Sequence, residues 1–146
     1  MDPGAADGSE PTPPLVLVVD DSADARAVLG GYLEYAGFRV ITAEDGEAAV
    51  TAARAEWPAV IIMDLAIPRM DGWEAMRRLR ADPLTADIPI VVISAYAFGD
   101  EPIRAREAGA DLCLSKPCLP SQVALVVRAM LERHRHSVIS TYTDTP

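Results

Sequence analysis

The chain has 146 residues, half of them apolar, which suits one domain with a single hydrophobic core. Its formal net charge of −9 disfavours nucleic acid as a partner, because binding to phosphates requires clustered Lys and Arg. The apolar runs are shorter than a membrane span and the N-terminus lacks the pattern of a secretory signal, so we expect a cytoplasmic protein with no membrane partner.

Strand and helix patterns alternate along the sequence. The first strand is the continuous apolar run LVLVV at 15–19, which is typical of a strand covered on both faces. The other strands are predicted at 38–42, 59–63, 88–93 and 111–115, and the helices at 23–36, 47–56, 73–80, 102–108 and 120–133. This alternation predicts an α/β fold with a parallel sheet and helices on both of its faces.

The two ends of the chain differ in composition from the middle. Residues 1–14 are rich in Pro, Gly, Ala and acid and are expected to form a flexible leader. Residues 134–146 are polar and are expected to form a C-terminal tail, which leaves 15–133 as the folded domain.

Apolar spacing indicates which helix faces are buried. The first helix is expected to bury Val28, Leu29, Tyr32, Leu33 and Ala36, and the last helix Val123, Val126, Val127, Met130 and Leu131. The aromatic side chains are interpreted as packing residues; they are Trp57, Trp73, Tyr32 and Tyr35.

Polar side chains follow four of the predicted strands. Asp20 and Asp21 follow the first, Asp64 the third, Ser94 the fourth and Lys116 the fifth, so all five are expected at one edge of the sheet. Three converging carboxylates repel one another unless a cation offsets their charge, and Mg²⁺ fits because it takes one or two carboxylates plus waters and a phosphate oxygen. The set predicts a phosphoryl-transfer site with Asp64 as the nucleophile.

Lys116 is the only lysine in a chain with twelve arginines. A compact ammonium can contact a single carboxylate or phosphoryl oxygen, whereas a guanidinium requires a bidentate partner and more room. Taken singly, Lys116 could be a solvated lysine, and Asp20 and Asp21 a helix cap and a surface acid. Their combination with Asp64 and Ser94 favours the phosphoryl site.

Four segments together resemble the receiver domain of two-component response regulators (CheY-like), over about residues 15–133. They are VVDDS, IIMDLAIPRMDGWE, VVISAYA and GADLCLSKP, in the order and spacing of that family. The resemblance implies a flavodoxin-like, doubly wound sheet of five parallel strands in the order 2-1-3-4-5 with five helices. It also implies that Asp64 accepts a phosphoryl group from a phosphohistidine of a histidine kinase or a histidine phosphotransfer protein, so that the domain is a phosphoacceptor and not an enzyme.

The resemblance also assigns metal ligands. By position, Asp21, Asp64 and the backbone carbonyl of Ala66 would bind Mg²⁺ directly, and Asp20 would help through water.

The remaining roles concern the phosphoryl group. Ser94 and Lys116 would hold its oxygens, and the Lys116–Pro117 peptide would be cis. Tyr96 lies at a position that tunes access to the site and the lifetime of the phosphoryl group in this family.

One position departs from the family pattern. Cys113 stands where the family usually has a Tyr or Phe, whose inward swing with the Ser94 hydroxyl would report phosphorylation to the face of the fourth helix, fifth strand and fifth helix. A downstream protein partner is expected on that face. The alternative is a constitutive docking module that keeps the fold without the switch.

Other interpretations are weaker. Haloacid-dehalogenase-like phosphatases need a second Asp two residues after the nucleophile, and a dinucleotide site needs GxGxxG after the first strand; neither pattern is present. Cys113 and Cys118 are expected as reduced thiols, and His134 and His136 as cations at a helix end. Since 13 residues follow Arg133, we expect a stand-alone regulator whose output requires a protein partner or a phosphorelay.

Overall fold

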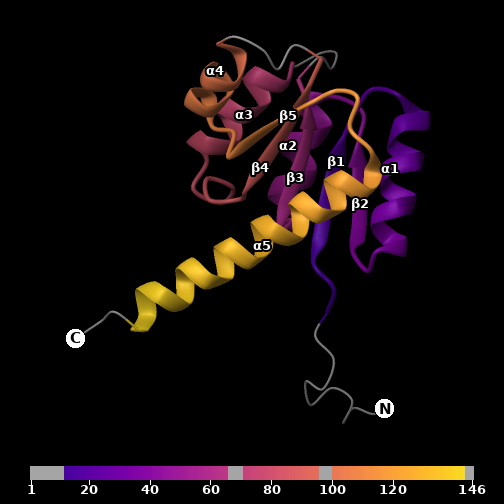
Figure 1. Cartoon of the computed structure of the whole chain (residues 1–146). Coiled ribbons are helices and arrows are strands. Elements are labelled where there is room, and N and C mark those ends of the chain that lie inside the picture. The colour runs from indigo at the N-terminus through magenta and orange to yellow at the C-terminus, as the bar shows by residue number, and fades with distance from the viewer. Residues whose placement is uncertain (1–11, 66–70, 96–99, 144–146) are drawn as a thin grey trace.

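The computed structural model describes residues 12–65, 71–95 and 100–143, with side chains described as far as Arg133. Strands and helices alternate throughout (Figure 1). The strands are β1 (Leu15–Val19), β2 (Arg39–Ala43), β3 (Val60–Asp64), β4 (Ile90–Ser94) and β5 (Leu112–Ser115). The helices are α1 (Ala23–Tyr35), α2 (Gly46–Glu56), α3 (Gly72–Ala81), α4 (Glu101–Ala108) and α5 (Pro120–Thr143).

The five strands form one parallel sheet in the order β2-β1-β3-β4-β5. This confirms the flavodoxin-like, doubly wound topology, in which the strand order reverses beside β1. Every predicted strand and helix is present, with ends shifted by one or two residues except at the end of α5.

Each face of the sheet carries its own apolar core. Leu17 and Val19 of β1 pack with α2, α3 and α4, whereas Val16 and Val18 pack with α1 and α5. All five residues of β1 are buried, so the prediction of a strand covered on both faces is confirmed.

Helix α1 buries a narrower face than its sequence pattern predicts. Leu33 and Gly30 are buried, and a Cβ at Gly30 would lie 3.4 Å from Cγ1 of Val40 in β2, about van der Waals distance. Val28 is 62% exposed and Tyr32 lies at the border of the buried stripe. The predicted burial of Val28 and Tyr32 is therefore wrong.

The prediction that the aromatic side chains are packing residues holds for one of the four. Trp73 is half-buried against the α2–α3–α4 core, and the Arg104 guanidinium lies 5.3 Å from the centre of its ring. Trp57 is exposed and has a left-handed backbone (φ 50°) where α2 ends, and Tyr32 and Tyr35 are exposed on α1. An exposed position tolerates many residue types, so the sequence alone could not show that these three aromatic side chains are exposed.

The last helix is longer than predicted. It continues ten residues beyond Arg133, to Thr143, and extends away from the sheet in Figure 1. Residues 134–143 contain neither Pro nor Gly, the two residues that most often end a helix. In the described part of the chain, no helix is both long enough and apolar enough to cross a membrane.

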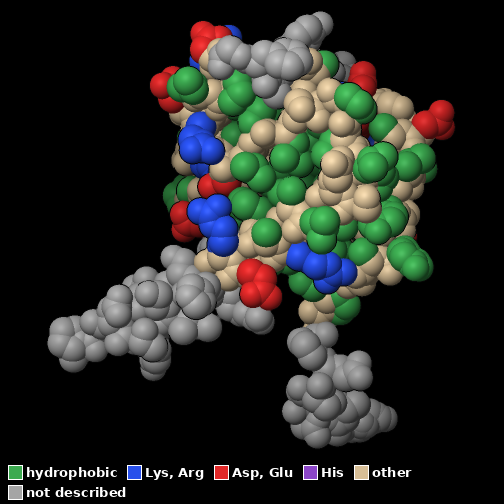
Figure 2. All heavy atoms as spheres, in the orientation of Figure 1, with side chains coloured by type: hydrophobic (Ala, Val, Ile, Leu, Met, Phe, Trp, Pro, Cys, Tyr) green, Lys and Arg blue, Asp and Glu red, His purple; other side chains and the backbone are tan. Residues whose placement is uncertain are grey.

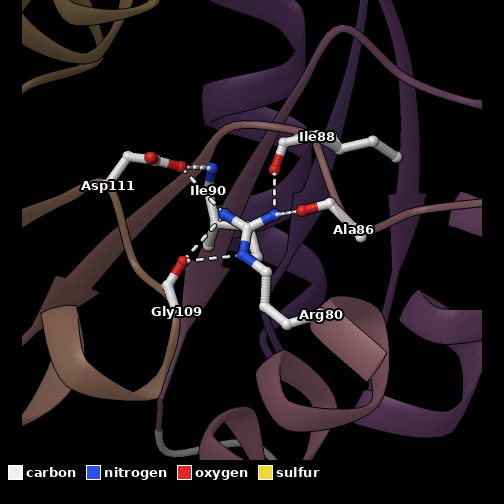
Figure 3. Close-up of polar contacts among 6 residues, drawn as sticks. All are labelled: Arg80, Ala86, Ile88, Ile90, Gly109 and Asp111. Atoms are coloured by element: carbon white, nitrogen blue, oxygen red, sulfur yellow. Dashed lines mark hydrogen bonds and ion pairs between the residues drawn. The ribbon is translucent and has the colours of Figure 1, made fainter. Parts of the chain in front are cut away.

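One arginine joins several segments at the amino ends of β4 and β5 (Figure 3). The guanidinium of Arg80, near the end of α3, donates hydrogen bonds of 2.6 to 3.0 Å. Its acceptors are the backbone oxygens of Ala86, Ile88 and Gly109 and a carboxylate oxygen of Asp111. The same Asp111 oxygen accepts the Ile90 N–H at 2.8 Å, so Arg80 connects α3 with the starts of both strands.

Candidate functional site

The five predicted site residues gather at the carboxyl edge of the sheet. Asp20 and Asp21 follow β1, Asp64 ends β3, Ser94 ends β4 and Lys116 follows β5. Parallel pairing brings these ends together: Asp64 pairs with Ile93, and the Lys116 N–H donates to the Ser94 carbonyl at 2.9 Å. The structure therefore places these side chains where strand order and spacing predicted them.

Three carboxylates converge at this edge. Asp20, Asp21 and Asp64 each offer one oxygen, and these oxygens lie within 4.8 Å of one another. Asp64 is only 6% exposed, whereas Asp21 is open to solvent. Burial raises the pKa of the Asp20 carboxyl above its ordinary value, with a smaller contribution from the Asp64 charge, while the Ser22 N–H, 2.9 Å from Asp20 Oδ1, opposes the rise.

This donor set suits a hard divalent cation. All three groups supply carboxylate oxygens, and at least one is exposed enough to leave room for water ligands. Mg²⁺ prefers oxygen ligands and keeps several waters. Its positive charge would offset the burial and the neighbouring carboxylate charge that disfavour the ionised form of Asp20.

Lys116 makes a single-point contact with the central carboxylate. Its Nζ donates to Asp64 Oδ2 at 3.0 Å, and the Lys116 side chain is 40% exposed whereas that of Asp64 is 7% exposed. The ammonium therefore meets a buried carboxylate from the solvent side. The Lys116–Pro117 peptide bond is cis, as the resemblance implied.

The start of α3 lies close to the end of β3. The Gly72 N–H donates to the Leu65 carbonyl at 3.2 Å, and a Cβ at Gly72 would lie 2.7 Å from Leu65 Cα and 2.9 Å from the Asp64 carbonyl oxygen. Asp71 caps α3 by accepting the Glu74 N–H at 2.8 Å. The start of α3 thus packs directly against the backbone of Asp64 and Leu65.

Ser94 is 3% exposed, and its hydroxyl donates to Oε1 of Glu101, the first residue of α4. Sequence reasoning did not identify Glu101, because a glutamate at the start of a helix is ordinary and the intervening loop sets its direction. Cys113 lies half-buried on β5, paired with Val92 of β4. Ala66 and Tyr96, which were assigned a metal-ligand and a gating role, lie outside the described residues.

A pocket of about 510 Å³ lies beside the site, lined by residues of α1, of the start of α5 and of the ends of β1 and β3. Leu29 and Val123 are among its apolar lining residues, and Asp64 and Lys116 also line it. Figure 2 shows hydrophobic side chains gathered over the face of the molecule that carries α1 and α5.

Comparison with known proteins defines the class. Residues 16–128 match the family described as the response regulator receiver domain. The chain belongs to this family, whose members are signalling domains of two-component systems.

Relatives of known name are regulatory proteins. The chain is 38% identical over 134 residues to the transcriptional regulatory protein PrrA of Mycobacterium tuberculosis, covering 92% of this chain and 56% of PrrA. It is 32% identical over 118 residues to the phosphate regulon transcriptional regulatory protein PhoB of Escherichia coli, covering 81% of this chain and 52% of PhoB. The chain thus spans about half the length of the curated relatives it matches.

Solved structures of response regulators have the same fold as this chain. The chemotaxis response regulator CheY4 of Vibrio cholerae superposes with a TM-score of 0.74 at 30% identity, covering 84% of this chain and 98% of that one. The Francisella response regulator 1452 receiver domain gives a TM-score of 0.78 at 26% identity, covering 83% and 98%.

Proposed function

We propose that Asp64 accepts a phosphoryl group, with Mg²⁺ bound, from a phosphohistidine of a histidine kinase or a histidine phosphotransfer protein. The observation that carries this proposal is the environment of Asp64. A nearly buried carboxylate has Lys116 Nζ at 3.0 Å and two further carboxylates whose oxygens lie within 4.8 Å. Such a site is suited to stabilising a transferring phosphoryl group.

In the proposed reaction an Asp64 carboxylate oxygen forms a bond to phosphorus as the bond from phosphorus to the histidine nitrogen breaks, and the imidazole leaves with the electron pair. Asp21, Asp64 and the Ala66 carbonyl would hold Mg²⁺, with Asp20 helping through water, and the bound ion would supply charge neutralisation. Lys116 and Ser94 hold phosphoryl oxygens, the first as a point charge and the second as a hydroxyl donor.

The donor would approach over the face of α1 and α5. The pocket there is lined by Asp64 and Lys116, and its apolar lining residues can bury surface against a donor protein. Downstream output would use a protein partner on the face of α4, β5 and α5. We place the domain in the cytoplasm, where a histidine kinase presents its phosphohistidine.

The alternative of a constitutive docking module rests only on Cys113. Against it stand the contact of Lys116 with Asp64 and the position of Ser94 at the end of the neighbouring strand β4, which support the phosphoryl chemistry proposed here.

The test is the intact mass of the protein after incubation with acetyl phosphate and Mg²⁺. We expect a phosphoryl increment in the wild type and none in Asp64→Asn or without Mg²⁺. The absence of an increment in folded wild-type protein sampled within seconds would contradict the proposal. A partner that then bound wild type and Asp64→Asn equally would establish the docking alternative.

A further inference from the structure

The hydrogen bond from Ser94 to Glu101 connects the site to α4. Ser94 ends β4 and its hydroxyl is buried, while Glu101 is half-buried in the first turn of α4. Both residues belong to the described part of the chain, and the bond spans the loop between them.

The start of α4 has no side-chain cap among the described residues. Asp100 stands at the N-cap position without a side-chain cap hydrogen bond, and Pro102 removes one backbone donor from the first turn. Among the eight residues of the helix, Ala105 is the buried one. The hydrogen bond between Glu101 and Ser94 is therefore one of two side-chain contacts described for this turn, together with the Arg104 guanidinium over the Trp73 ring.

The first turn of α4 also lies beside the strand that lacks the family's aromatic residue, because Pro102 of α4 and Cys113 of β5 line the same pocket. Burial raises the pKa of the Cys113 thiol, and the negative charge of Glu101 raises it further.

We propose that Glu101 is a positioning residue that competes with the phosphoryl group for the Ser94 hydroxyl, and that its release on phosphorylation loosens the start of α4. The inference rests on the proposed function of Asp64. A serine hydroxyl carries one proton and can donate it to one acceptor at a time. Glu101 and an Asp64 phosphoryl group are both anionic acceptors, so gaining one contact requires losing the other.

This exchange provides a route for the signal that needs no aromatic rotation. When Ser94 turns to the phosphoryl oxygen, Glu101 loses its buried donor and becomes a carboxylate that is better solvated away from the sheet. The first turn of α4 then opens more often. Cys113 need not move, which accounts for a small residue at that position in a working receiver.

The experiment measures amide hydrogen exchange of residues 101–110, together with intact mass, in the presence and absence of acetyl phosphate and Mg²⁺. In the wild type we expect phosphorylation to raise exchange in this segment about tenfold, as expected for the loss of one hydrogen bond to a charged group. In Glu101→Ala the exchange should be raised without a phosphodonor and should not change on phosphorylation, although the phosphoryl increment still forms.

Three further variants make the test specific. Ser94→Ala should match Glu101→Ala without a phosphodonor, and the double variant should exchange no faster than either single variant, because both changes remove the same bond. Glu107→Ala, which removes an exposed acid of the same helix, should respond like the wild type.

The possible failures are distinguishable. A phosphoryl increment in both wild type and Glu101→Ala, with the same exchange response of α4 in each, would overturn the role of Glu101 and leave the proposed function intact. No increment in the wild type would refute the proposed function, and with it the competition between Glu101 and the phosphoryl group for the Ser94 hydroxyl.

Discussion

Replacing Gly72 by alanine tests whether the start of α3 holds Asp64 in place. A Cβ at Gly72 would come within 2.7 Å of Leu65 Cα and 2.9 Å of the Asp64 carbonyl oxygen. Both contacts are with backbone atoms, so no side-chain rotation can relieve them. Either α3 or the end of β3 must shift.

The expected magnitude combines two opposing effects. Overpacking of this kind usually costs about 1–3 kcal/mol. Alanine in a helix is favoured over glycine by at most about 1 kcal/mol, and by less in the first turn. We therefore expect Gly72→Ala to lower the free energy of unfolding by roughly 1–2 kcal/mol and to slow phosphorylation, because the shift moves the acceptor carboxylate.

Gly31→Ala is the matched control. Gly31 is exposed within α1, and its added Cβ would have no heavy atom within 4 Å apart from its own helix backbone and chain neighbours. Here the helix propensity acts alone, so the free energy of unfolding should rise by about 0.5–1 kcal/mol with phosphorylation unchanged.

Urea unfolding and the rate of the phosphoryl mass increment measure the two effects. If Gly72→Ala were as stable as Gly31→Ala and were phosphorylated at the wild-type rate, the close packing of α3 against Asp64 would not constrain the site, and this reasoning would be refuted.

Four further predictions concern other contacts. Lys116→Arg should slow phosphorylation at least about tenfold, because a planar guanidinium cannot reproduce the single contact of the ammonium with Asp64. A phosphoryl mass increment equal to that of the wild type at equal times would contradict this. Arg80→Lys should lower the free energy of unfolding by about 1–3 kcal/mol in urea, because an ammonium cannot serve all four acceptors; an unchanged midpoint would show that the cluster adds no stability. Alkylation of Cys113 and Cys118 should be slow near pH 8, because burial raises the pKa of both thiols above the ordinary value of 9.0 and the thiolate forms only at higher pH. Glu101→Ala should speed alkylation of Cys113 more than that of Cys118, because the Glu101 charge raises the pKa of the Cys113 thiol only. Equal acceleration of both thiols would contradict an effect of Glu101 on Cys113.

The burial of the strands and the positions of the residues at their ends could be predicted from the sequence pattern. The run LVLVV indicated a strand buried on both faces, and the carboxylates at the carboxyl ends of β1 and β3 had to meet at one edge once the strands were parallel. The strand order came from the family resemblance, because alternation alone does not specify where the order reverses. The phosphoryl and metal roles of these residues remain predictions.

Contacts made across loops were not predictable. Arg80 reaches backbone carbonyls as far as 29 residues away, and a carbonyl is present at every position, so no sequence pattern marks its acceptors. Glu101 and Ser94 belong to different elements, and no sequence spacing marks a hydrogen bond between them.

The most direct measurement is the position of the phosphoryl group. After brief incubation with acetyl phosphate and Mg²⁺, borohydride reduces an aspartyl phosphate to homoserine, which fragment masses can assign to one residue. We predict homoserine at position 64 only, dependent on Mg²⁺. Homoserine at position 20 or 21, or none in a sample whose intact mass shows the increment, would contradict the assignment of Asp64 as the acceptor.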